Sequence, residues 1–186
     1  MSVIVMEGSH GAGKSTMIKN MEERYDLVSL KSIPDWFRKY LSFARSLPPD
    51  IQKQVYLIGH DANYVTFQEN KDYILDRYYY TTIIRLNYEL QKDPDYTVKE
   101  ILDINIKPDI VFYLKIDKDT LINRLTNRGD CYLFDSDFFD YENEIYGQLC
   151  HESDRIILVN NQDNVDVTIN EIDKHLQKQK VLLRRK

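Results

Sequence analysis

Short apolar runs alternate along the chain with segments in which apolar residues recur at helical spacing. The apolar runs predict five β-strands, at residues 3–6, 27–30, 73–76, 109–114 and 156–159. The periodic segments predict helices at about 14–24, 36–43, 49–69, 83–90, 98–104, 118–126, 137–149 and 165–183. Strands that alternate with helices in this way predict an α/β fold, in which a doubly wound, five-stranded parallel sheet is flanked by helices.

The chain reads G-x-x-x-x-G-K-S from Gly8 to Ser15, between the first predicted strand and the first predicted helix. Strand, glycine loop and helix are the context of a P-loop, whose backbone N–H groups and helix dipole face a polyanion. Lys14, a predicted catalytic residue, would then reach the β- and γ-phosphates, and the Ser15 hydroxyl would bind Mg²⁺. The sequence therefore predicts a P-loop NTPase-type sheet that binds a nucleoside triphosphate. The predicted nucleotide-binding residues are Gly8, Ser9, His10, Gly11, Ala12, Gly13, Lys14, Ser15 and Thr16.

The third predicted strand ends in Asp76-Arg77-Tyr78. Because ligands bind at the carboxyl ends of parallel strands, these residues are expected near the P-loop. Asp76 would hold the water shell of Mg²⁺ or accept a proton from a phosphate acceptor, and Arg77 offers two parallel donors to the acceptor's phosphate. Asp76 and Arg77 are predicted catalytic residues, and Ser15 and Asp76 are the predicted metal-binding residues. The alternative is that Asp76 only caps a helix within a surface ion pair.

Arg124 and Arg128 are four residues apart in R-L-x-x-R-G, so they share one helix face before Gly129. Phosphoryl transfer needs cations around the moving group and the exclusion of water. Both arginines are therefore predicted catalytic residues beside a short lid at about 128–137. The alternative is a solvated helix end whose cations only complement the helix dipole.

Composition narrows the class of protein. A chain of 186 residues, 42% of them hydrophobic, is long enough for one domain with its own core. The net charge of −5 argues against nucleic acid as a partner, and no apolar run approaches the ~18 residues that a membrane span needs. The two cysteines, Cys131 and Cys150, are too few for a disulfide framework. We therefore expect a cytoplasmic protein that acts on a small molecule.

Taken together, these motifs resemble the thymidylate kinase family. The resemblance rests on Glu7-Gly8 and the P-loop, on D-R-Y with Thr81 and Thr82 downstream, on P-D-I-V-F-Y-L from residue 108, and on R-L-x-x-R-G. Further similar residues are Asp137-Phe138-Phe139 and Tyr146, so the likeness runs from residue 2 to about residue 146. The combination of the three downstream motifs is more specific than the P-loop, which many families share.

The resemblance implies a single nucleotide kinase domain over residues 1–186, with the short lid. It implies that ATP and Mg²⁺ bind at residues 11–16, that Arg77 holds the 5′-phosphate of the acceptor, and that Arg124 and Arg128 lie near ATP. The reaction would transfer the γ-phosphoryl group of ATP to a deoxynucleoside monophosphate, most of all dTMP. Members of this family commonly pair as homodimers through their helices.

Two other functions remain open. Deoxynucleoside kinases share a P-x-x-W-like segment and a glutamine that reads the base, and Pro34-Asp35-Trp36 and Gln54-x-Tyr56 resemble these features. A nucleoside acceptor would need no phosphate-binding arginine, so dependence on Arg77 separates the two kinases. A GTPase-like switch would need an N-K-x-D motif, which the sequence lacks. In the thymidylate kinase family, by contrast with this sequence, an acid usually occupies the position of His10.

Overall fold

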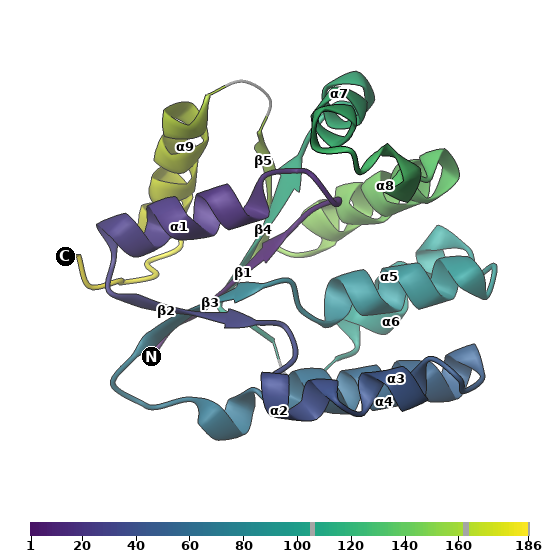
Figure 1. The fold of residues 1–186 in the computed structure, drawn as a ribbon. Coiled ribbons are helices and arrows are strands. Elements are labelled where there is room, and N and C mark those ends of the chain that lie inside the picture. The colour runs from purple at the N-terminus through teal and green to yellow at the C-terminus, as the bar shows by residue number, and fades with distance from the viewer. Residues whose placement is uncertain (105–106, 162–163, 186) are drawn as a thin grey trace.

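The computed structural model describes residues 1–104, 107–161 and 164–185. Within these residues five parallel strands form one sheet in the order β2-β3-β1-β4-β5 (Figure 1). The strands are β1 (Val3–Glu7), β2 (Leu27–Lys31), β3 (Asp72–Asp76), β4 (Ile110–Lys115) and β5 (Ile156–Asn160). Each strand begins and ends within one residue of its predicted position, so the five-stranded parallel sheet is confirmed.

Helices cover both faces of the sheet, because the central strand is apolar on both sides. Ile4 and Met6 of β1 pack with residues of α1 (Lys14–Arg24), α7 (Lys118–Arg128) and α9 (Val165–Lys178). Val3 and Val5 pack with residues of α5 (Tyr79–Glu89), α6 (Pro94–Leu102) and α8 (Ser136–Glu152). Tyr78, Tyr79 and Tyr80 are buried in this second cluster, so the tyrosine run packs inside the protein.

The region between β2 and β3 differs most from its prediction. The helix predicted at 36–43 is two short helices, α2 (Asp35–Arg38) and α3 (Leu41–Ala44). The helix predicted at 49–69 ends earlier, since α4 (Pro49–Asp61) is followed by a 3₁₀ turn, η1 (Tyr64–Thr66). The physical reason lies at Asn63, whose side-chain amide donates to the carbonyl oxygens of Lys31 and Ser32. This long-range anchor ties the end of α4 to the end of β2.

Three later helices also have a bound four or five residues from the predicted one, and the first of them, predicted at 83–90, begins at Tyr79. The helix predicted at 98–104 begins at Pro94, because the side chain of Asp93 caps it by accepting from the backbone N–H of Tyr96 at 2.7 Å. The helix predicted at 165–183 ends at Lys178, and Lys180 adopts a left-handed conformation with φ of 56°. The chain then crosses to the start of β2, where the N–H of Asp26 donates to the carbonyl of Arg184. Residues 105–106, 162–163 and 186 lie outside the described residues.

The carboxyl ends of β1 and β3 lie side by side, with Met6 of β1 paired with Asp76 of β3. The loop between β1 and α1 and the segment that follows Asp76 therefore meet at one edge of the sheet (Figure 1). In the part of the chain that the structure describes, no helix combines the length and the apolar character that crossing a bilayer requires.

Candidate active site

The loop from Gly8 to Gly13 joins β1 to α1 and has the conformation that its glycines allow. Gly8 and Gly13 have φ angles of 141° and 93°, which disfavour a residue with a side chain. A Cβ atom at Gly8 would lie 2.9 Å from the carbonyl oxygen of Leu114, and one at Gly13 would lie 2.6 Å from Nδ2 of Asn161. Asn161 itself donates from Nδ2 to the carbonyl of Ala12. The residue directly after β5 thus holds this loop by a side-chain hydrogen bond.

Lys14, the first residue of α1, lies back over the loop. Its Nζ donates to the carbonyl oxygens of Gly8 at 2.7 Å and Ser9 at 2.9 Å. Burial, and next the positive charge of Arg77, lower the pKa of Lys14 to about 7, against the opposing effect of nearby carboxylates such as Asp76. An anionic phosphate beside this ammonium group would favour its charged form.

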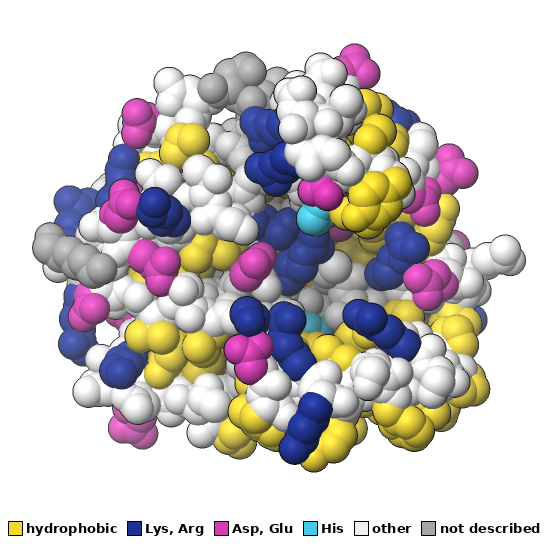
Figure 2. Space-filling view, viewed as in Figure 1, with side chains coloured by type: hydrophobic (Ala, Val, Ile, Leu, Met, Phe, Trp, Pro, Cys, Tyr) yellow, Lys and Arg dark blue, Asp and Glu magenta, His cyan; other side chains and the backbone are white. Residues whose placement is uncertain are grey.

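A polar cavity of about 230 Å³ opens between the loop and the end of β3. It is lined by His10, Gly11, Gly13, Lys14, Ser15, Thr16, Asp76, Arg77 and Arg128. Of the nine residues predicted to bind the nucleotide, six therefore share one cavity with both predicted metal-binding residues. We call it the phosphate cavity. Figure 2 shows lysine and arginine side chains gathered around a hollow near the centre of this face.

Asp76 ends β3 with a carboxylate oxygen that is not satisfied. Its Oδ1 is buried and has no hydrogen-bond partner among the described residues. A buried carboxylate oxygen in this position fits a bound cation or a proton donor. The Ser15 hydroxyl lines the same cavity, so the two predicted metal-binding residues fit Mg²⁺ that arrives with a nucleotide. Among the described residues, no group of three or more histidine, cysteine or acidic side chains is arranged so that it could hold a metal ion.

Arg77 follows Asp76 in a left-handed conformation with φ of 68°, and its N–H donates to the carbonyl of Met6. Its Nη1 donates to Oγ1 of Thr81 at 3.0 Å. Thr81 in turn donates to Glu7, which also accepts from the backbone N–H of Tyr78 at 2.8 Å. These bonds aim the guanidinium group of Arg77 away from the sheet and into the cavities at its edge.

Glu7 was missing from the predicted site, although it ends β1 directly before the glycine loop. Its side chain is completely buried, and burial raises its pKa to about 7 in spite of the nearby positive charge of Arg77. The sequence did contain one signal for a role of Glu7 in the site, namely an acid at the end of an apolar strand. Only the paired register of β1 and β3 shows that it orients Arg77.

The two arginines of α7 have different places. Arg128 lines the phosphate cavity. Arg124 lies close to Gly13, and its Nη2 donates to the carbonyl of Asn161 at 3.3 Å. The segment predicted as a lid contains the end of α7, a 3₁₀ turn η2 (Cys131–Leu133) and the start of α8.

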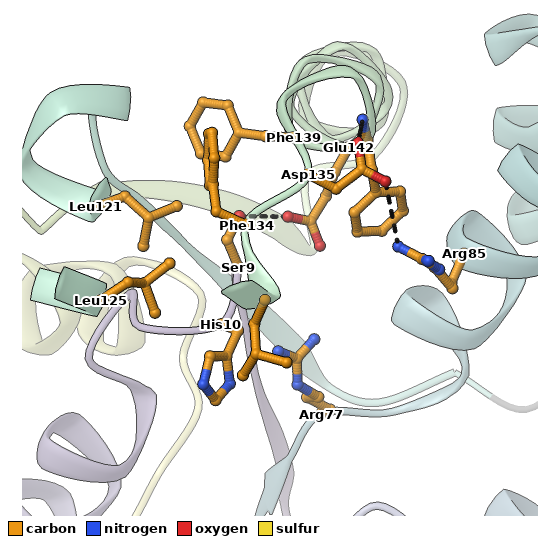
Figure 3. Close-up of a pocket in the computed structure, with 12 residues that line it drawn as sticks. Ser9, His10, Arg77, Arg85, Leu121, Leu125, Phe134, Asp135, Phe139 and Glu142 are labelled. Carbon is orange, nitrogen blue, oxygen red and sulfur yellow. Dashed lines mark hydrogen bonds and ion pairs between the residues drawn. The ribbon is translucent and has the colours of Figure 1, made fainter. Parts of the chain in front are cut away.

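A second cavity, of about 300 Å³, lies between the glycine loop, the predicted lid, α5 and α8 (Figure 3). Its lining combines the apolar residues Leu121, Leu125, Leu133, Phe134, Phe138 and Phe139 with the polar residues Ser9, His10, Arg77, Arg85, Asp135 and Glu142. Figure 3 shows the Ser9 hydroxyl bonded to Glu142, and the ion pair of Arg85 with Asp135. We call this the mixed cavity. A lining of apolar and charged side chains suits a ligand that has both apolar and charged parts.

A third cavity, of about 420 Å³, lies between α4 and α5 and is lined by Arg45, Gln52, Tyr56, Thr81, Thr82, Arg85, Leu86 and Glu89. Gln54, considered above as a glutamine that reads the base, is exposed on α4, whereas Gln52 of the same helix lines this third cavity. The three cavities form a series, because His10 and Arg77 line the first and second, and Arg85 lines the second and third.

A glycine loop, an acid and an arginine at adjoining strand ends define a phosphate-binding protein of the P-loop class. Residues 6–172 match the family described as thymidylate kinase, so the chain belongs to the thymidylate kinase family. The structure is similar to that of deoxyadenosine kinase from M. mycoides with bound dATP, with a TM-score of 0.66 and 22% identity over 95% of this chain and 100% of that one. At this identity the likeness concerns the fold.

Similar relatives carry more than one name. A thymidylate kinase of Leptospira interrogans serogroup Icterohaemorrhagiae serovar copenhageni is 27% identical over 145 residues, which cover 68% of this chain and 70% of the relative. A thymidylate kinase of Rickettsia conorii is 26% identical over 162 residues, covering 77% and 78%. An adenylate kinase of Mesomycoplasma hyopneumoniae (strain 7448) is 31% identical over 138 residues, covering 69% of this chain. The chain spans 58% of the length of that adenylate kinase.

Proposed function

We propose that this protein transfers the γ-phosphoryl group of ATP to a deoxynucleoside monophosphate, with dTMP as the acceptor. Membership of the thymidylate kinase family supports the class of reaction. The observation that carries the proposal is the position of Arg77, which lines both the phosphate cavity and the mixed cavity. A cation between the two cavities can hold the acceptor's phosphate next to the donor's.

The phosphate cavity would hold the triphosphate of ATP. Lys14 and Arg128 would neutralise charge on the transferred group, and Ser15 and Asp76 would hold Mg²⁺, which supplies further neutralisation of phosphate charge. An oxygen of the acceptor's phosphate forms a bond to the γ-phosphorus while the bond from that phosphorus to the β-phosphate oxygen breaks, and ADP leaves. The protein contributes position and charge, and the segment 128–137 would act as the lid that excludes water.

The mixed cavity and the cavity between α4 and α5 would hold the acceptor. Its phosphate would bind to Arg77, and its base would extend past Arg85 toward Gln52 and Tyr56. An amide and a phenol can each donate and accept hydrogen bonds, which suits the edge of a base. The preference for dTMP itself rests on the family.

The test measures ADP release with Mg-ATP against a panel of nucleoside monophosphates and the matching nucleosides. We expect turnover with dTMP or a close monophosphate, and loss of most of that turnover in Lys14→Ala and in Arg77→Gln. The matched control is Arg155→Gln, which changes an exposed arginine outside the three cavities and should keep wild-type rates. ATP binding without turnover on any member of the panel would refute the proposal.

A second candidate function is phosphorylation of a nucleoside 5′-hydroxyl. The observation in its favour is the unpartnered Oδ1 of Asp76, since a hydroxyl acceptor must lose its proton to a base and a carboxylate can take it. Turnover on nucleosides alone, little affected by Arg77→Gln and abolished by Asp76→Asn, would establish this alternative.

We also propose that the protein acts in the cytoplasm as a homodimer. Both cysteines are free thiols, which suits a reducing compartment. Trp36, Phe43 and Ile58 expose apolar side chains on the neighbouring helices α2, α3 and α4, and a second copy of the chain would cover them. Sedimentation of the wild type beside Phe43→Glu tests this, and a monomeric wild type would refute the pairing.

A further inference from the structure

Glu142 of α8 is a buried acid whose carboxylate is only half satisfied. Glu142 is 1% exposed, and it lines the mixed cavity. Its Oε2 accepts a hydrogen bond from the hydroxyl of Ser9 in the glycine loop. Its Oε1 is buried and has no hydrogen-bond partner among the described residues (Figure 3). A buried carboxylate oxygen without a partner is costly, so its position calls for a ligand.

The bond between Glu142 and the glycine loop accounts for only one of the two carboxylate oxygens of Glu142. The bond from Ser9 occupies Oε2, and a neutral glutamine or a hydroxyl could accept that bond equally well. The second acid that lines this cavity, Asp135, has partners for both oxygens: its Oδ1 caps α8 by accepting from the N–H of Phe138, and its Oδ2 lies 3.9 Å from Nη1 of Arg85. Among the described residues that line the mixed cavity, Glu142 therefore offers a buried carboxylate oxygen without a hydrogen-bond partner.

The charges of the cavity decide which ligand group Glu142 would meet. A carboxylate accepts hydrogen bonds and repels a phosphate, so a phosphate in this cavity turns toward Arg77 and a hydrogen-bond donor turns toward Glu142. In a nucleoside monophosphate the group nearest to the 5′-phosphate that can donate is the hydroxyl on the same sugar ring. The base lies farther away and would extend past Arg85 into the cavity between α4 and α5.

We infer that Glu142 accepts a hydrogen bond from the 3′-hydroxyl of the acceptor's sugar, and so sets which sugars the protein takes. This inference rests on the proposed function, because it needs an acceptor nucleotide whose phosphate is held by Arg77. Together the two residues orient the acceptor at two points. Ser9 would be a positioning residue, since its hydroxyl holds Oε2 and leaves Oε1 toward the cavity.

The test compares the binding of dTMP with that of its 3′-deoxy counterpart, 2′,3′-dideoxythymidine monophosphate, by calorimetry. We expect the wild type to bind dTMP about tenfold to hundredfold more tightly, as for a hydrogen bond to a charged group. In Glu142→Gln, which keeps an acceptor for Ser9, this ratio should fall below about fivefold. Glu144→Gln, which changes an exposed acid on the same helix, is the matched control and should keep the wild-type ratio.

An equal affinity ratio in the wild type and in Glu142→Gln would overturn the inference. If Glu142 had only a structural role, its replacement would weaken the binding of both nucleotides to the same extent. A wild-type ratio near one would overturn it without any variant, which covers the case that Glu142→Gln does not fold. In both cases turnover of dTMP by the wild type would leave the proposed function standing. A wild type that binds no monophosphate of the panel would instead refute both.

Discussion

Glu7 and Arg77, at the ends of neighbouring strands, bind the same hydroxyl group. Oγ1 of Thr81 donates to the carboxylate of Glu7 and accepts from Nη1 of Arg77. The left-handed backbone of Arg77 and the bond from the N–H of Tyr78 to Glu7 complete this arrangement. The direction of Arg77 into the cavities therefore depends on a buried acid that itself contacts neither cavity.

Replacing Thr81 with valine should weaken the acceptor site and the fold together. Thr81→Val keeps the shape of the side chain but leaves an oxygen of the buried Glu7 unpaired, so the free energy of unfolding should fall by about 1–3 kcal/mol. KM for the acceptor should rise more than KM for ATP, because Arg77 loses its orienting partner. Urea unfolding and initial rates measure the two effects. The control is Thr126→Val on the exposed face of α7, and equal effects of both changes would contradict the prediction.

Stability should depend on pH through Glu7. Its pKa rises on folding from 4.5 to about 7, because burial disfavours the carboxylate. Between these two values the folded state binds a proton that the unfolded state has lost, so Glu7's contribution to stability is largest below about pH 4.5 and falls as pH rises toward 7. The fall is at most about 3 kcal/mol. Urea unfolding at pH 5 and pH 7.5 gives the free energy of unfolding of the wild type and of Glu7→Gln. The difference between the two proteins should decrease from pH 5 to pH 7.5, and a constant difference would count against the prediction.

His60 should give a pH dependence of opposite sign. It is buried between Ser32 and Thr82, with Nδ1 3.0 Å from the carbonyl of Ser32 and Nε2 2.8 Å from Oγ1 of Thr82. Burial lowers its pKa from 6.5 to about 4, so between these values the unfolded state binds a proton that the folded state does not. Stability from this group is complete above about pH 6.5 and is lost as pH falls through 4, by at most about 3 kcal/mol.

His60→Gln should flatten this acid loss of stability relative to the wild type. Urea midpoints between pH 4 and pH 7 measure it, with His151→Gln, at an exposed histidine, as the control for losing an imidazole. An unchanged slope in His60→Gln would show that another group carries the acid loss.

Asn161 should support the nucleotide side of the site. Its Nδ2 holds the carbonyl of Ala12 in the glycine loop, and its Oδ1 accepts from Thr168 at 3.1 Å. In Asn161→Ala both partners lose a buried bond, so KM for ATP should rise while KM for the acceptor changes little. Asn170→Ala, on the exposed side of α9, is the control. A larger rise in KM for the acceptor than for ATP would argue against this role.

The two arginines of α7 should separate kinetically. Arg128 lines the phosphate cavity, so Arg128→Gln should lower kcat by about tenfold to a thousandfold through lost charge stabilisation. Arg124 bonds to the carbonyl of Asn161 close to Gly13, so Arg124→Gln should raise KM for ATP more than it lowers kcat. Steady-state rates at varied ATP distinguish them, and a greater loss of kcat in Arg124→Gln would reverse the assignment.

The sheet and the glycine loop were predictable because their signals are local. A buried parallel strand needs a nearly continuous apolar run, and a loop that turns at Gly8 and Gly13 needs residues without side chains. The end of α4 was not predictable, because Asn63 bonds to β2 and no local pattern records that contact. The start of α6 did have a local signal, because Asp93 before Pro94 is a typical capping residue. The prediction followed the apolar spacing at 98–104 instead and therefore began the helix too late.

The acids of the site also divide into those with a local sequence signal and those that only long-range packing brings to the site. Glu142 stands in a helix rich in acidic residues, where a single sequence cannot separate a buried carboxylate from its solvated neighbours. It becomes part of a site only because α8 packs beside the glycine loop, so that Ser9 and Glu142 meet. The roles of Lys14, Asp76 and the arginines stay predictions that the kinetic tests address.

By itself, the sequence determined the parallel sheet, the glycine loop, and the acid and arginine at the end of β3, since each depends on residues that are neighbours in the chain. The tertiary structure alone decided which groups line the cavities and which groups orient them. Glu7 reaches Arg77 through the pairing of β1 with β3, and Glu142 reaches the mixed cavity through the packing of α8. The physical reason is that burial and hydrogen-bond partners belong to the packed molecule, and these decide whether a carboxylate is a surface charge or a binding group.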